Sequence, residues 1–157
     1  MADERLPAAE ILGGLGLGLP PVATPAGAYV PAVVAGDLVF TAGQLPFVEG
    51  ALPETGKVGA EIDVDEATAF ARIAVLNALA AADSAIGSLD RVTQVVKATV
   101  FVASDPSFTG QPAVADGASD LLGQVFGDAG RHARSAVGVT VLPLDAPVEV
   151  ELILRFA

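Results

Sequence analysis

The residues best suited to chemistry in this chain are Arg134 and Glu149, near its C-terminal end. A guanidinium presents a planar fork of donors that can hold a carboxylate at two points, and a nearby glutamate can orient or deprotonate a water. Together they could hydrolyse a small anionic substrate. Arginine and glutamate also form structural ion pairs across subunit contacts, and the residue types taken alone favour this second explanation.

Other catalytic schemes find less support. The single histidine, His132, would need a serine beside it to act as a hydrolase base, and Ser135 points to the opposite face of an extended strand. A lone loop histidine is more often solvated or structural. Because the chain has no cysteine, we expect neither a thiol nucleophile nor a metal site stronger than a weak cluster of oxygen ligands.

Length and charge exclude several classes of protein. The 157 residues suit one domain, and 8 Lys and Arg against 19 Asp and Glu give a net charge of -11, which opposes binding to nucleic acid. Acidic residues stand where the basic region of a signal peptide would lie, and no apolar run approaches the roughly 20 residues that span a bilayer. We therefore expect a cytoplasmic protein without a nucleic-acid or membrane partner.

Local signals predict the helices that must position these residues. Asp63 and Glu66 form a D-x-x-E capping signal before an alanine-rich helix over about residues 64–86, which should stop at Gly87. A second helix is predicted over about 112–126. Glycines and prolines follow a short helix over about residues 3–13, so we assign residues 1–25 to an N-terminal arm and residues 26–157 to a single domain.

Five runs predict strands, and the first two form a hairpin across Gly36. In the last strand Glu149 and Glu151 lie opposite an apolar face. The order β-β-α-β-α-β-β suggests one sheet with both helices on its apolar face and a second face that bears Arg134, Glu149 and Glu151, as an oligomer interface or a site. The predicted strands cover residues 29–34, 38–41, 91–102, 134–142 and 148–156.

Six short motifs in a fixed order resemble the Rid family, also called the YjgF/YER057c/UK114 family, of enamine and imine deaminases. The resemblance runs from about residue 25 to the end of the chain. Each motif is weak alone, but together they are specific. They are Tyr29-Val30; Thr41-Ala42-Gly43-Gln44-Leu45-Pro46; Thr55-Gly56-Lys57-Val58; residues 95–102; Ala133-Arg134-Ser135-Ala136-Val137 with Leu142-Pro143; and Val148-Glu149-Val150-Glu151.

The resemblance implies a chorismate-mutase-like α+β fold, assembled as a homotrimer with ligand sites in the clefts between subunits. It implies that Arg134 grips the carboxylate of a 2-imino or 2-enamino acid such as 2-aminoacrylate, and that Glu149 handles the attacking water. Tyr29 would close over the ligand, and backbone groups near Gly43 and Ala136 would orient it. Water would add to the imine carbon and ammonia would leave, which yields a 2-keto acid without any cofactor.

Four positions depart from the family pattern and bear on the substrate range. Ala136 replaces a common cysteine, His132 a proline and Ala42 a serine, while Asp116 stands near the place of an asparagine on the second helix. Ala136 and Ala42 keep open a second hypothesis, a non-catalytic trimer that binds a small carboxylate as a sensor or chaperone-like protein. An older family label, endoribonuclease, fits poorly with the net charge of -11.

Overall fold

The sheet begins with a hairpin whose turn depends on one glycine. In the computed structural model, which describes residues 5–157, β1 (Ala32–Ala35) and β2 (Leu38–Thr41) pair antiparallel around Gly36, at φ +62°. The first strand was predicted from Tyr29 but starts at Ala32. Pro31 precedes it and has no backbone N–H to donate to a ladder, so Tyr29 lies outside the sheet.

The two long helices begin and end near the predicted residues. α2 (Val64–Ile86) opens with a full capping box, in which Asp63 Oδ1 accepts from the Glu66 N–H and Glu66 Oε2 accepts from the Asp63 N–H, both at 2.9 Å. Gly87 ends the helix at φ +91°, a conformation that glycine adopts without strain. α3 (Gln111–Phe126) starts one residue before the predicted position.

Three longer strands complete the mixed sheet: β3 (Val92–Ala103), β4 (Ala133–Val139) and β5 (Val148–Phe156). The strand order is β1-β2-β5-β3-β4, with β3 and β4 parallel and the other pairs antiparallel. β4 was predicted to reach residue 142 but stops at Val139. Val139 pairs with Ala103, the last residue of β3, so no backbone partner remains beyond it.

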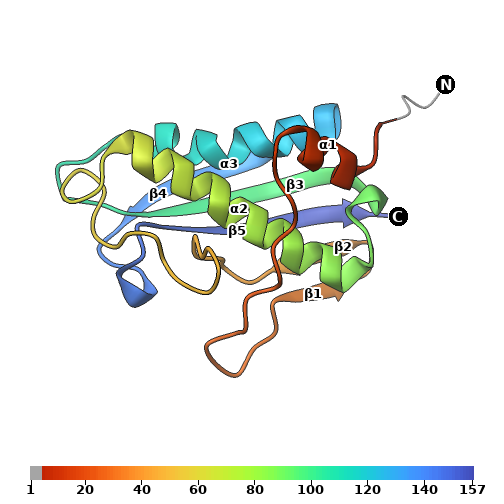
Figure 1. Ribbon diagram of the computed structural model, residues 1–157, viewed down its shortest axis with the longest axis horizontal. Helices are drawn as coiled ribbons and strands as arrows, with labels where there is room; N and C mark the ends of the chain where they lie inside the picture. Colours follow the sequence, from red (N-terminus) through yellow and green to blue (C-terminus); the bar gives the residue numbers. More distant parts are fainter. Residues whose placement is uncertain (1–4) are drawn as a thin grey trace.

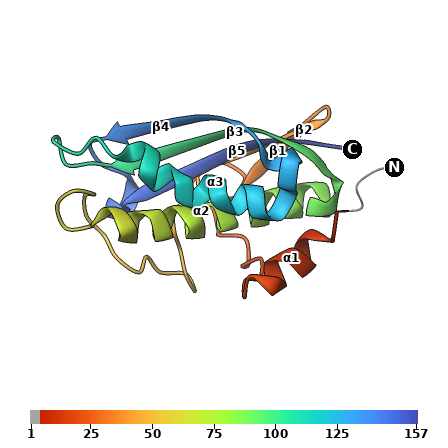
Figure 2. The same cartoon turned by 90° about the horizontal axis from the view of Figure 1, so that it is seen from above.

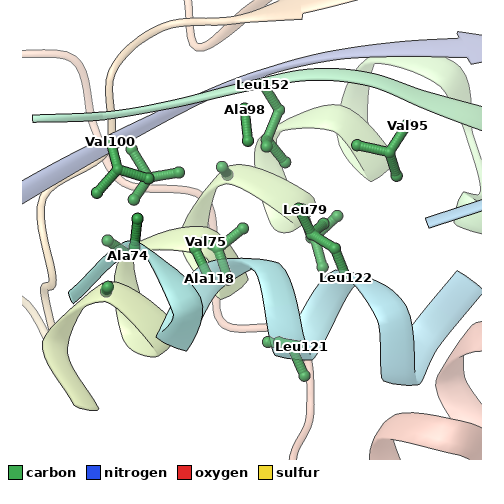
Figure 3. Close-up of a cluster of buried hydrophobic side chains, with 14 of the residues drawn as sticks. Ala74, Val75, Leu79, Val95, Ala98, Val100, Ala118, Leu121, Leu122 and Leu152 are labelled. Carbon is green, nitrogen blue, oxygen red and sulfur yellow. The ribbon is translucent and has the colours of Figure 1, made fainter. Parts of the chain in front are cut away.

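The helices and the sheet form two layers, with α2 and α3 covering one face of the sheet (Figures 1 and 2). α1 (Ala8–Gly14) lies on the side of the helices away from the sheet, and its Ala8 and Leu12 are buried in the same core. The first residues of the predicted helix over 3–13 lie outside the described residues. Side chains from both helices and from β3 and β5 meet between the layers (Figure 3), among them Ala74, Val75, Leu79, Val100, Ala118, Leu122 and Leu152.

α2 is long and apolar enough, by length and composition, to cross a membrane. In the fold, however, 61% of an 18-residue apolar window of this helix is buried inside the domain, where α2 lies on the sheet beside α3. Packing in the core of the domain therefore accounts for its apolar character.

The structure corrects the predicted placement of Arg134. Arg134 and Ala136 pair with Ala98 and Val100 of β3, which are buried under the helices, so Arg134 lies on the helix-covered face and not beside Glu149 and Glu151. The sequence analysis assigned the alternation along β4 correctly. It placed the face that carries Arg134, Ala136 and Gly138 on the outside of the sheet, whereas this face lies under the helices. Small residues are needed there because α3 passes close: a Cβ atom at Gly138 would lie 2.8 Å from Nε2 of Gln111.

Candidate functional site

Three of the predicted site residues line one pocket of about 350 Å³. Tyr29 comes from the segment before β1, Gly43 from the loop after β2, and Glu149 from the outward side of β5. The pocket is therefore formed where the hairpin, the C-terminal strand and the N-terminal arm meet. Its lining residues are 23–26, Tyr29, Pro31, 43–45, Phe47, Pro143, Leu144 and Glu149.

The Glu149 carboxylate occupies space that only a glycine leaves free. A Cβ atom at residue 43 would lie 1.8 Å from Glu149 Oε1, so the carboxylate rests directly on the backbone of Gly43. Burial raises the pKa of Glu149, and the negative charge of Glu151 two residues away raises it further. A carboxyl group with a raised pKa, in a pocket, is suited to proton transfer.

Tyr29 stands at the mouth of this pocket. Its side chain is exposed, and its hydroxyl accepts a hydrogen bond from the Ala26 N–H at 3.3 Å, so the tyrosine and the end of the arm share one wall. Buried Asn77 on α2 supports the loop part of the pocket lining by donating to the carbonyls of Leu45 and Phe47, each at 3.1 Å. The prediction did not include Asn77, because nothing in its sequence context marks an amide that supports a loop.

Arg134 makes a separate cluster with α3. Its Nη1 donates to Asp116 Oδ1 at 2.7 Å and to Ser119 Oγ at 3.2 Å, and its Nη2 donates to the Pro112 carbonyl at 3.4 Å. Within residues 5–157, its Nε has no hydrogen-bond partner. Part of the guanidinium fork is therefore already used by Asp116, and part of it stays open to a ligand.

His132 belongs to this second cluster and not to a solvated loop. Its Nε2 lies 2.9 Å from Ser119 Oγ and its Nδ1 lies 2.7 Å from the Gly130 carbonyl oxygen. Ser135 points away, as predicted, and accepts a hydrogen bond from Lys97 on the other face. Ser119 was missed because it is 13 residues from His132 on a different element; the only signal was its i+3 spacing from Asp116 along α3.

Within one chain the two groups do not form a joint site. Tyr29, Gly43 and Glu149 share a pocket, whereas Arg134 and Ala136 lie on the helix-covered side of edge strand β4. Among residues 5–157 no group of three or more His, Cys, Asp or Glu side chains is close enough to hold a metal ion. The arrangement provides a carboxyl group for proton transfer on one side and a cation for anchoring an anion on the other.

The fold and the ordered motifs agree with comparisons to known proteins. The family model described as "YjgF/chorismate_mutase-like, putative endoribonuclease" matches residues 9–156, so the chain belongs to the YjgF/Rid family and has its chorismate-mutase-like α+β fold. The match includes most of the arm, which the six motifs had left out.

Individual relatives span nearly the whole chain. Protein TCP17 of Trypanosoma cruzi is 48% identical over 142 residues, which are 90% of this chain and 89% of that protein. The crystal structure of Atu1372 from Agrobacterium tumefaciens, a protein of unknown function, is 40% identical, with a TM-score of 0.89 over 96% of this chain and 92% of its own. The structure of Escherichia coli TdcF with bound serine is 27% identical, with a TM-score of 0.61 over 88% and 93% of the two chains.

Proposed function

We propose that this protein hydrolyses reactive 2-enamino or 2-imino acids, such as 2-aminoacrylate, to 2-keto acids and ammonia in the clefts of a cytoplasmic homotrimer. The observation that carries the proposal is the Glu149 carboxyl group, half-buried against Gly43 in a pocket shared with Tyr29, with its pKa raised. Such a group can take a proton from a water as it attacks an imine carbon and return a proton to the departing amine. No cofactor is required by this scheme.

The positions of Arg134 and Glu149 support an assembly between subunits. They lie on opposite faces of one sheet, so a substrate held by both must bring the Arg134 cluster of one subunit to the Glu149 pocket of its neighbour. Cyclic symmetry would repeat this junction around the ring. The outward side of the sheet, including Val33, Phe40 and Val137, is exposed in the single chain and gives such an assembly apolar surface to bury.

The ligand chemistry fits a small carboxylate. TdcF, which shares the fold, was crystallised with serine, an amino acid whose carboxylate matches the one that Arg134 would hold here. The free Nε of Arg134 and its partly used Nη2 leave donors for a bidentate contact. Holding the unstable imine against a positioned water would remove much of the entropy cost of their encounter.

A direct test generates 2-aminoacrylate in place with a serine dehydratase and follows release of the keto acid. We expect Arg134→Ala to lower the enzyme-dependent rate by about 100-fold or more, because anchoring and orientation are lost together. Arg155→Ala is the matched control, since Arg155 also pairs with an aspartate, Asp37, at 3.1 Å. Equal rates for the wild type and Arg134→Ala would refute the proposal.

The alternative function, a trimer that only binds a carboxylate metabolite, is separated by calorimetry with the keto acid. Ala136, which has no polar side-chain atom beside Arg134, is the feature that favours it. Tight binding without turnover of the imine would establish this alternative and exclude hydrolysis.

A further inference from the structure

Ser119 is held between a base and a cation. The Gly130 carbonyl can only accept, so His132 must carry its proton on Nδ1 in the neutral form, which leaves the Nε2 lone pair facing Ser119 Oγ at 2.9 Å. The serine hydroxyl therefore donates to His132. Its oxygen also accepts from Nη1 of Arg134 at 3.2 Å.

These contacts match the requirements of an activated nucleophile. A serine hydroxyl is weakly nucleophilic until a neighbouring base can take its proton, and the base needs a third group that fixes its orientation and tautomer. Here the Gly130 carbonyl is the third group. The Arg134 guanidinium would stabilise the negative charge that develops on Oγ as its proton leaves.

The serine is also accessible. A pocket of about 460 Å³ opens onto Ser119, His132 and Arg134. Three of its other lining residues are the glycines 123, 127 and 130, which carry no side chains to obstruct an approach to Oγ. Ser119 and His132 are half-buried and both line the pocket, so the pair is partly shielded from water and still within reach of a ligand.

From this geometry we infer that Ser119 and His132 form a catalytic dyad for acyl transfer from small esters, an activity beyond the proposed imine hydrolysis. Ser119 Oγ attacks the acyl carbon and its proton passes to His132 Nε2. The bond from the acyl carbon to the alcohol oxygen breaks, and that oxygen takes the proton from His132. Water then attacks the acyl-serine with His132 as base, which releases the carboxylic acid and restores the serine.

The first experiment treats the intact protein with a fluorophosphonate probe and maps the adduct by mass spectrometry. We expect one adduct, on Ser119, that Ser119→Ala abolishes and that His132→Gln slows by about 100-fold or more. Ser107→Ala is the matched control, because Ser107 is exposed and its hydroxyl donates to the carboxylate of Asp105 instead of a histidine. Labelling spread over several serines, or a rate that His132→Gln does not change, would overturn the inference.

A second experiment keeps the test valid if Ser119→Ala or His132→Gln disturbs folding. The chain has no cysteine, so Ser119→Cys introduces a single thiol whose pKa follows from the pH dependence of its alkylation by iodoacetamide. We expect the pKa of this thiol to lie well below the usual value of about 8.5, and adding His132→Gln to raise it again, while Arg134 still holds it below that value. An ordinary thiol pKa in Ser119→Cys would contradict activation. Neither experiment uses an imine, so the dyad and the proposed deaminase can fail independently.

Discussion

The Glu149 pocket and the Arg134 cluster hold their charged groups in opposite ways. The Glu149 carboxylate is half-buried without a hydrogen-bond partner among residues 5–157, and its pKa is raised. Arg134, by contrast, has a carboxylate, a hydroxyl and a carbonyl within reach on α3. The first region therefore leaves a charged group without compensating contacts, whereas the second holds its charged group in a network of hydrogen bonds.

Under the proposed function, the two regions would supply different parts of one reaction. A proton-transfer group gains from desolvation, because its pKa then approaches the working pH. An anchoring cation gains from being held rigidly, since fewer rotamers are lost when the ligand binds. Within the described part of the chain, the Glu149 pocket contains no anchoring cation and the Arg134 cluster contains no carboxyl group with a raised pKa, so the proposal requires that a neighbouring subunit bring the two together.

The strongest test of the comparison is complementation between two inactive variants. We expect Arg134→Ala and Glu149→Gln each to lose imine hydrolysis by about 100-fold or more. If a site takes Arg134 from one subunit and Glu149 from the next, mixed trimers regain activity. When equal amounts of the two variants assemble at random, three quarters of the trimers contain both. Each mixed trimer has one site in three with both the native Arg134 and the native Glu149, so the mixture should recover about a quarter of the wild-type rate.

The mixture is prepared by co-expression with two different tags, and sedimentation velocity checks that trimers form. Each variant assayed alone at the same total concentration is the control. If the mixture is no more active than the two variants apart, Arg134 and Glu149 do not act together across a subunit contact.

The second prediction concerns how tightly the glutamate is positioned. Gly43→Ala would place a Cβ atom 1.8 Å from Glu149 Oε1 and force the carboxylate to swing away. We expect kcat to fall by about 10- to 100-fold, the usual cost of displacing a reacting group by about 1 Å, while the fold is kept because a flexible side chain can move. Gly14→Ala, where a Cβ atom meets open space, should leave kcat unchanged.

The sequence predicts the surroundings of Glu149 better than it predicts those of Arg134. The elements around Glu149 have local signals: Gly36 marks the hairpin turn, the Asp63 and Glu66 pair marks the start of α2, and β5 alternates cleanly between Val and Glu. The location of Glu149 on the outward face of the sheet was therefore predictable. The family resemblance placed Gly43 near the ligand, but the contact between Gly43 and the Glu149 carboxylate was not predicted.

The Arg134 cluster could not be located in this way. β4 carries small residues on the side that faces α3 and valines on the other, so apolar alternation predicted the wrong face for Arg134. The partner residues Asp116 and Ser119 come from a helix that precedes the strand, and local sequence does not show how the two elements approach. Only the packing of α3 against the sheet brings them together.

The third prediction asks whether the network around Arg134 limits substrate binding. Asp116 Oδ1 lies 2.7 Å from Nη1 of Arg134 and competes with a substrate carboxylate for the same cation. We expect Asp116→Asn to lower KM for the imino acid roughly 1.5- to 5-fold, which corresponds to the ~0.2 to 1 kcal/mol of a partly exposed ion pair. Asp37→Asn, which disrupts the ion pair with Arg155, is the control. A higher KM in Asp116→Asn would show instead that the aspartate orients the arginine.

The smallest expected effect is on stability, and it has opposite signs at two glutamates. Burial raises the pKa of Glu149, so the folded chain keeps the Glu149 proton to a higher pH than the unfolded chain does. The protonated carboxyl group stabilises the fold at low pH, and this contribution is lost as the pH rises through the folded pKa. Glu149→Gln cannot ionise. This variant should therefore be more stable than the wild type at neutral pH, and the difference should vanish in acid.

Glu61 provides the matched comparison. The Lys57 N–H donates to its carboxylate at 2.9 Å and lowers the pKa of Glu61, so its contribution is present at neutral pH and is lost as the pH falls through the folded pKa. Glu61→Gln should be less stable than the wild type at neutral pH and should converge with it in acid. Urea unfolding at fixed protein concentration, at neutral pH and near the ordinary pKa of glutamate, measures both differences. If Glu149→Gln is not more stable than the wild type at neutral pH, Glu149 is not held as a destabilised carboxylate, and the contrast between the two regions loses its electrostatic basis.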